Sequence, residues 1–129
     1  MTFKNMLDVL VVDDTSTSRA LICGALDQCG IANYRIARDG EEAFKAMVVK
    51  PAPLVISDMQ MPKMTGIGLL KALREYAPTS KVGFILVTGL ADKNIILEGK
   101  KFGLNNFLLK PFTTPAMLAC IEAVTGKLK

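Results

Sequence analysis

Short apolar runs rich in β-branched residues alternate with amphipathic stretches along the whole chain. Each run has the length of a strand and is followed by a turn or a polar segment. The predicted strands are 8–12, 33–37, 54–57, 82–87 and 106–109. This alternation is typical of a parallel sheet with helices on both faces, so we predict a single doubly wound α/β domain of (βα)5 type.

Between the predicted strands, apolar residues recur at the spacing of helices. The five stripes are Ile22, Ala25, Leu26, Cys29; Phe44, Met47, Val48; Leu69, Leu70, Leu73, Tyr76; Ile95, Ile96, Phe102; and Met117, Ile121, Val124, Leu128. Thr114 is the predicted N-cap of the last helix, with Pro115 at its first position. Gly30 and Gly103 are predicted to end the helices that precede them.

The chain has 129 residues, of which 50% are hydrophobic and 22% charged, as in one compact globular domain. Its longest apolar stretch, 82–91, contains Gly83, Thr88 and Gly89 and is too short to span a membrane. Residues 1–8 do not resemble a secretory signal peptide. We expect one domain over 1–129 without an effector domain, no membrane insertion, and a cytoplasmic location.

Charge and cysteine content exclude several classes of function. The net charge of +4 comes from scattered basic residues, with no reading helix and no aromatic platform, so we expect no DNA binding. Cys23, Cys29 and Cys120 lack the spacing of metal ligands and are predicted to be reduced core residues. Because the chain has no histidine, any imidazole chemistry must come from another protein.

Polar residues follow four of the five predicted strands. Asp13 and Asp14 come after the first strand, Asp58 after the third, Thr88 after the fourth and Lys110 after the fifth. The carboxyl ends of parallel strands meet at one edge of the sheet, where ligands bind in this class of fold. We therefore expect three carboxylates, a hydroxyl and an ammonium group to converge there.

Three carboxylates at close range repel one another and need compensation by a cation. Oxygen ligands without His or Cys favour a hard ion, and Mg²⁺ suits a few carboxylates plus phosphate oxygens. Beside such an ion Asp58 could act as a nucleophile toward phosphorus, with Lys110 and Thr88 binding the phosphoryl oxygens. Singly, each residue has an ordinary explanation as a turn, cap or surface residue, so the combination carries the hypothesis.

Four segments carry a resemblance to a known family: VLVVDDTSTSR (9–19), VISDMQMPKMTG (55–66), VTG (87–89) and LLKPFT (108–113). They resemble the receiver domain of two-component response regulators, over essentially the whole chain. Within that family the chain is most similar to the single-domain chemotaxis regulators of the CheY type. The resemblance implies a five-stranded parallel sheet of order 2-1-3-4-5.

The resemblance also implies roles at the site. Asp58 would accept a phosphoryl group from a phosphohistidine of a CheA-like sensor histidine kinase, catalysing its own modification without being a turnover enzyme. Mg²⁺ would be bound by Asp14, Asp58 and the backbone carbonyl of Gln60, with Asp13 acting through water. Thr88 and Lys110 would contact the phosphoryl group.

The implied switch couples the site to an output surface. Phe107 would turn inward once the Thr88 hydroxyl moves toward the phosphoryl group, and the Lys110–Pro111 bond would be cis. The output surface would be the fourth helix, fifth strand and fifth helix, which carry the basic residues Lys93, Lys100 and Lys101. Its partner would be a flagellar motor switch protein or another output protein, bound by a monomer. A phosphate sink or a phosphorelay intermediate is the alternative role.

Three residues depart from the usual family pattern. Thr65 stands where Asp commonly precedes the glycine and is expected to cap a helix. Gly89 stands where alanine is common, which would loosen the loop that must move. Leu90 replaces the more frequent polar residues near the phosphoryl group.

Two other classes of protein compete with this interpretation. A flavodoxin-like module could bind a flavin phosphate in the hydroxyl-rich stretch 15–18, but Asp13 and Asp14 would repel it, and only Tyr34 and Tyr76 could stack on the flavin. An aspartyl phosphohydrolase would space its paired aspartates by one residue, whereas here they are adjacent.

Overall fold

The computed structural model describes residues 7–89 and 92–126 of the chain. Its centre is a five-stranded sheet, and all four strand pairings are parallel. The strands are β1 (Val9–Val12), β2 (Tyr34–Ala37), β3 (Leu54–Asp58), β4 (Gly83–Thr88) and β5 (Asn106–Leu109). Their order, β2-β1-β3-β4-β5, confirms the predicted order 2-1-3-4-5.

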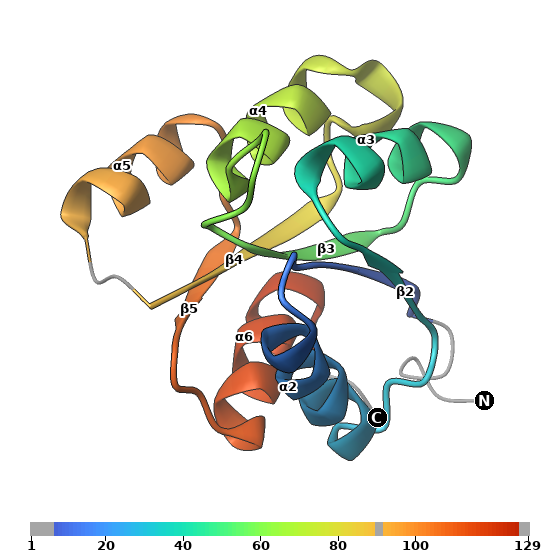
Figure 1. Cartoon of the computed structure of the whole chain (residues 1–129), viewed down its shortest axis with the longest axis vertical. Coiled ribbons are helices and arrows are strands. Elements are labelled where there is room, and N and C mark those ends of the chain that lie inside the picture. Colours follow the sequence, from blue (N-terminus) through green and yellow to red (C-terminus); the bar gives the residue numbers. More distant parts are fainter. Residues whose placement is uncertain (1–6, 90–91, 127–129) are drawn as a thin grey trace.

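Helices cover both faces of the sheet, as predicted. They are α2 (Ser16–Gln28), α3 (Gly40–Val49), α4 (Gly66–Glu75), the short 3₁₀ helix η1 (Ala77–Thr79), α5 (Lys93–Lys101) and α6 (Thr114–Thr125). Figure 1 shows α2 and α6 on one face of the sheet and α3, α4 and α5 on the other. The result is a three-layered α/β/α domain.

The strands divide their side chains between two apolar layers. In β1, Val9 and Val11 pack in the layer of α2 and α6, whereas Leu10 and Val12 pack in the layer of α3 and α4. All four side chains are fully buried. A strand buried on both faces needs apolar residues at every position, which is why β1 reads as a continuous apolar run.

The ends of the elements follow local chemistry. Gly30 and Gly103 have φ of 83° and 82°, in the left-handed region, and end α2 and α5 as predicted. Thr65 is the N-cap of α4, and its hydroxyl accepts from the Gly68 amide at 3.1 Å, as expected for a capping residue. The predicted cap Thr114 was wrong by one residue: the Thr113 hydroxyl accepts from the Ala116 amide.

Arg74, near the end of α4, ties three segments together. Its guanidinium donates to the carbonyls of Ser80 and Val82, at 3.2 and 2.8 Å, and so holds the start of β4. It also donates to the Gly103 carbonyl at 2.9 Å and to Asn105 Oδ1 at 3.0 Å. Burial lowers the pKa of Arg74 from its ordinary value. One planar donor group therefore joins α4 to β4 and to the turn before β5.

The three cysteines are free thiols that differ in burial. Cys29 and Cys120 are buried free thiols, as predicted, but Cys23 is only half-buried and packs against the core from its edge. Within the described residues, no helix is both long and apolar enough to cross a bilayer.

Candidate functional site

The parallel register brings the predicted site residues to one edge of the sheet. Val12 of β1 pairs with Ser57 of β3, so Asp13 follows β1 at the level where Asp58 ends β3. Thr88 ends β4, and its carbonyl accepts from the amide of Lys110, just past β5, at 2.9 Å. The convergence expected from the strand order is therefore present.

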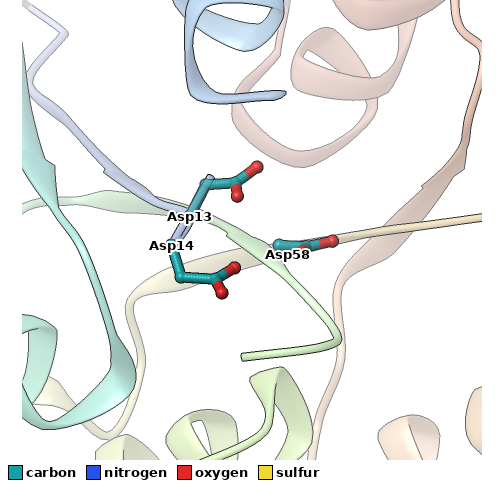
Figure 2. Close-up of side chains that lie close together, drawn as sticks. All are labelled: Asp13, Asp14 and Asp58. Carbon is teal, nitrogen blue, oxygen red and sulfur yellow. The ribbon is translucent and has the colours of Figure 1, made fainter. Parts of the chain in front are cut away.

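Three carboxylates form an acidic cluster at this edge. Oxygens of Asp13, Asp14 and Asp58 all lie within 4.8 Å of one another, and Figure 2 shows the three side chains together where β1 and β3 end. Asp13 is fully buried and Asp58 is 8% exposed, whereas Asp14 is open to solvent. The cluster thus combines two carboxylates withdrawn from water with one that faces it.

Asp13 is held in a fixed orientation. Its Oδ1 accepts from the Thr15 amide at 3.0 Å, and its backbone carbonyl accepts from Arg19 Nη1 at 2.9 Å. Its Oδ2 is buried and has no hydrogen-bond partner among the described residues. An orphaned buried carboxylate oxygen is costly, and a hard cation or a water bound to one would satisfy it. The donor set, all oxygen, therefore fits Mg²⁺.

Lys110 contacts Asp58 directly. Its Nζ donates to Asp58 Oδ1 at 3.1 Å, across 52 residues of sequence. Burial raises the pKa of Asp58 above its ordinary value, the hydrogen bond and charge of Lys110 lower it, and the charge of Asp13 raises it; the net direction is upward. The surroundings of Asp58 therefore disfavour its negatively charged form, and a cation bound nearby would stabilise that form.

A pocket of about 370 Å³ opens over these groups. It is lined by Asp14, Thr15, Asp58, Gln60, Thr88, Gly89 and Lys110. The predicted metal, acceptor and phosphoryl-binding residues therefore meet at one opening, apart from Asp13, which lies buried beside it. Phe107 does not line this pocket; it is half-buried on β5 and packs on the layer of α3 and α4.

The sequence of residues 9–122 matches the model of the response regulator receiver domain. The chain belongs to this family. Receiver domains of this family are phosphorylation-activated regulators, so the predicted response regulator is confirmed and the flavodoxin-like alternative is not favoured. The acidic cluster is of the kind at which receiver domains generally bind Mg²⁺.

Relatives of this receiver domain are chemotaxis proteins. A probable chemotaxis protein CheY of Rhizobium etli is 46% identical, with all of both chains covered. The chemotaxis protein CheY of Pseudomonas aeruginosa is 33% identical over 92% of this chain and 95% of its own. The solved structure of Vibrio cholerae CheY4 is similar with a TM-score of 0.84 at 30% identity, covering 92% of this chain and 98% of that one. The predicted chemotaxis type is thereby confirmed.

Other features expected of a receiver domain can be placed as well. The Lys110–Pro111 bond is cis, as the resemblance implied. At Gly89 a Cβ would meet nothing within 4 Å, so no described neighbour excludes a side chain there. Leu90 lies outside the described residues.

One residue at the receiver site was missed from sequence. Lys110 Nζ also donates to Ser18 Oγ, at 2.9 Å. Ser18 belongs to the hydroxyl-rich stretch 15–18, which from sequence alone suggests a loop for a flavin phosphate. That stretch was the available indication, but its contact with a lysine 92 residues away depends on how α2 lies on the sheet.

Proposed function

We propose that Asp58 of this receiver domain accepts a phosphoryl group from a phosphohistidine of a CheA-like sensor histidine kinase. The observation that carries the proposal is the placement of Asp58: Lys110 Nζ lies 3.1 Å from one of its oxygens, and two further carboxylates lie within 4.8 Å. Cationic and acidic groups at that spacing suit a site that binds a metal ion and a phosphoryl group together. The absence of histidine is consistent with a donor on another protein.

The metal ligands in this proposal are Asp14, Asp58 and the backbone carbonyl of Gln60, with Asp13 acting through water. The orphaned Oδ2 of Asp13 and the all-oxygen donor set support this assignment. When bound, Mg²⁺ would neutralise negative charge on the transferring group and on the carboxylates. Asp14, which is exposed, gives the ion access from solvent.

The transfer is a substitution at phosphorus. A carboxylate oxygen of Asp58 forms the new bond to phosphorus while the bond from phosphorus to the donor imidazole nitrogen breaks, and the electron pair of that bond stays on nitrogen. The Lys110 ammonium and the Thr88 hydroxyl bind the phosphoryl oxygens as negative charge moves toward Asp58. The product is an acyl phosphate on β3.

Phosphorylation then changes the surface that partners contact. The new charge draws Thr88 and Lys110 toward Asp58, and movement of Thr88 makes room for Phe107 to turn inward. Lys93, Lys100 and Lys101 are exposed on α5, next to β5. A basic surface there suits an acidic segment of a partner. The partner in this proposal is a flagellar motor switch protein or another output protein, as the resemblance to chemotaxis regulators implies.

Acetyl phosphate with Mg²⁺ tests the acceptor. We expect wild-type protein to gain the mass of one phosphoryl group, Asp58→Asn to gain none, and the control Asp27→Asn, exposed on α2, to behave as wild type. Intact-mass spectrometry reads all three. A wild type that stays unmodified, or an Asp58→Asn variant that is still modified, would overturn the assignment.

The output partner needs a separate experiment. Affinity capture from kinase-active cells, comparing wild type with Asp58→Asn, is expected to enrich an output protein with wild type only. Equal recovery with both proteins would argue against phosphorylation-dependent binding.

A further inference from the structure

Ser18 of α2 contacts a residue of the phosphoryl site from outside the strand ends. Its Oγ accepts a hydrogen bond from Lys110 Nζ at 2.9 Å, shorter than the 3.1 Å contact of the same nitrogen with Asp58 Oδ1. Ser18 is half-buried in the first turn of α2. The lysine is therefore shared between a charged and a neutral acceptor that come from different elements.

The two contacts use two of the three donors on the ammonium group. A lysine ammonium carries three N–H groups and rotates freely about its last bond unless its partners fix it. With one N–H on Asp58 and one on Ser18, the direction of the third is determined. Lys110 lines the pocket over Asp58 and Thr88, the side from which a phosphoryl oxygen would accept the third N–H.

Ser18 and Lys110 also line a second hollow. This groove, of about 520 Å³, runs between α2 and the segment that joins β5 to α6, with Leu21, Pro111 and Phe112 along it. The Lys110 side chain is 31% exposed, and it borders both the groove and the acceptor pocket. Without the Ser18 hydroxyl, the flexible side chain could turn its ammonium toward the groove and away from Asp58.

We propose that Ser18 is a positioning residue for phosphoryl transfer, which holds the Lys110 ammonium over Asp58 and directs its free N–H at the incoming phosphoryl group. This inference rests on the proposed function of Asp58. Ser18 acts only through Lys110: it supplies no ligand to the metal and no contact to the reacting atoms. It links the first turn of α2 to the acceptor.

Rates of phosphorylation by acetyl phosphate test the role. We expect Ser18→Ala to lower the second-order rate constant about tenfold, the scale of losing one hydrogen bond to a charged group. Ser18→Thr keeps the hydroxyl and is expected to stay within about twofold of wild type. The matched control is Ser16→Ala, the same change on the same helix, because the Ser16 side chain is exposed and makes no hydrogen bond within the described residues.

A double-mutant cycle separates positioning from a general structural effect. In a Lys110→Met background, which keeps the apolar stem and removes the ammonium, Ser18→Ala is expected to leave the remaining rate unchanged. The Mg²⁺ dissociation constant is expected to be the same in Ser18→Ala and wild type. An equal loss of rate with and without Lys110, or a Ser18→Ala variant as fast as wild type, would overturn the inference.

The hydrogen bond can also be tested without any phosphorylation. In Mg²⁺-free urea denaturation, the destabilisation by Ser18→Ala is expected to fall to less than about half in the Lys110→Met background. If the two substitutions lower the unfolding free energy additively, Ser18 and Lys110 do not interact and the hydrogen bond between them is refuted. A wild type that never gains a phosphoryl group would instead overturn the function of Asp58, and the positioning role with it, even where the urea cycle shows coupling.

Discussion

Gly66, the first residue of α4, lies directly against the backbone of Asp58. A Cβ added at Gly66 would come 2.5 Å from the carbonyl oxygen of Asp58 and 2.6 Å from Leu86 Cδ1. The Gly66 amide donates to the Met59 carbonyl at 2.9 Å, which closes the loop after β3 onto the start of α4. Glycine is required here by close approach, and its position fixes the backbone that carries the acceptor.

Gly66→Ala is therefore expected to destabilise the domain by about 1–3 kcal/mol, the usual cost of overpacking. It should also slow phosphorylation, because relief of the clash has to move the backbone of Asp58 or Met59. Urea denaturation and labelling with acetyl phosphate give the two values. Gly24→Ala is the control: a Cβ there meets nothing within 4 Å, and alanine inside α2 should stabilise by about 0.5–1 kcal/mol. Equal effects at the two glycines would contradict the packing argument.

Mg²⁺ is expected to raise the thermal stability of the wild type. The ion is expected to bind because it relieves repulsion within the acidic cluster. Binding to the folded state alone then stabilises that state by about 1.4 kcal/mol for each tenfold excess of Mg²⁺ over the dissociation constant. Asp14→Asn should be slightly more stable than wild type without the ion and should lose most of the response to it. Differential scanning fluorimetry with and without EDTA measures both. An undiminished Mg²⁺ response in Asp14→Asn would exclude Asp14 as a ligand.

Arg74→Lys is expected to destabilise the domain by about 1–3 kcal/mol although the positive charge is retained. A lysine cannot reproduce the fork that donates to four oxygens, so the partly buried carbonyls of Ser80 and Val82 before β4 would lose their partner. The control is Arg38→Lys, at an exposed position, which should change the unfolding free energy by less than about 0.5 kcal/mol. Urea denaturation of the wild type and the two variants gives the unfolding free energies. A loss of stability in Arg74→Lys no larger than in Arg38→Lys would contradict the role of Arg74 in joining α4 to β4.

Cys120 should make stability depend on alkaline pH. Burial raises the pKa of its thiol from 9.0 to about 11, so the folded state keeps a proton that the unfolded chain releases. The stabilisation by the buried, protonated Cys120 thiol is complete below pH 9. It is lost as the pH rises toward 11, by at most about 1.4 kcal/mol per pH unit. The stability difference between wild type and Cys120→Ala should shrink across this range. A difference that is constant with pH would show that the thiol does not titrate with a raised pKa.

The three cysteine thiols should differ in reactivity. Cys23 is half-buried, whereas Cys29 and Cys120 are buried. Although burial also raises the pKa of Cys23, its sulfur is within reach of solvent, so a thiol reagent should modify it first in the native protein. Peptide mapping after brief alkylation gives the order. Modification of Cys120 before Cys23 would contradict the packing of α6.

The strands and the acidic edge could be predicted from sequence because both depend on topology rather than on side-chain detail. Alternating apolar runs specify a parallel sheet, and a parallel sheet brings the residues after its strands to one edge. Asp58 and Lys110 are 52 residues apart, yet the parallel sheet places both at the same edge, on either side of the end of β4. Strand ends differed from prediction by one residue at most, since hydrogen bonding rather than hydropathy decides the last residue.

Contacts made by helix side chains could not be predicted in the same way. Ser18 and Arg74 are polar residues on amphipathic helices, where the default expectation is a solvated side chain. Which acceptor each one meets depends on the tilt and rotation of α2 and α4 against the sheet, and periodicity does not determine these. The Thr113 cap was missed for a related reason: two adjacent threonines offer the same hydroxyl, and only backbone geometry chooses between them.

The register of β1 serves two purposes at once. A slip of this strand by one residue would exchange Val9 and Val11 with Leu10 and Val12 between the two apolar layers, and it would carry Asp13 out of line with Asp58. An insertion or deletion inside β1 should thus abolish folding and metal binding together. The strand that aligns the acidic cluster also builds the core, so the two cannot be altered separately. New specificity for partner proteins can therefore arise more freely in the loops and helix faces around the cluster than in β1.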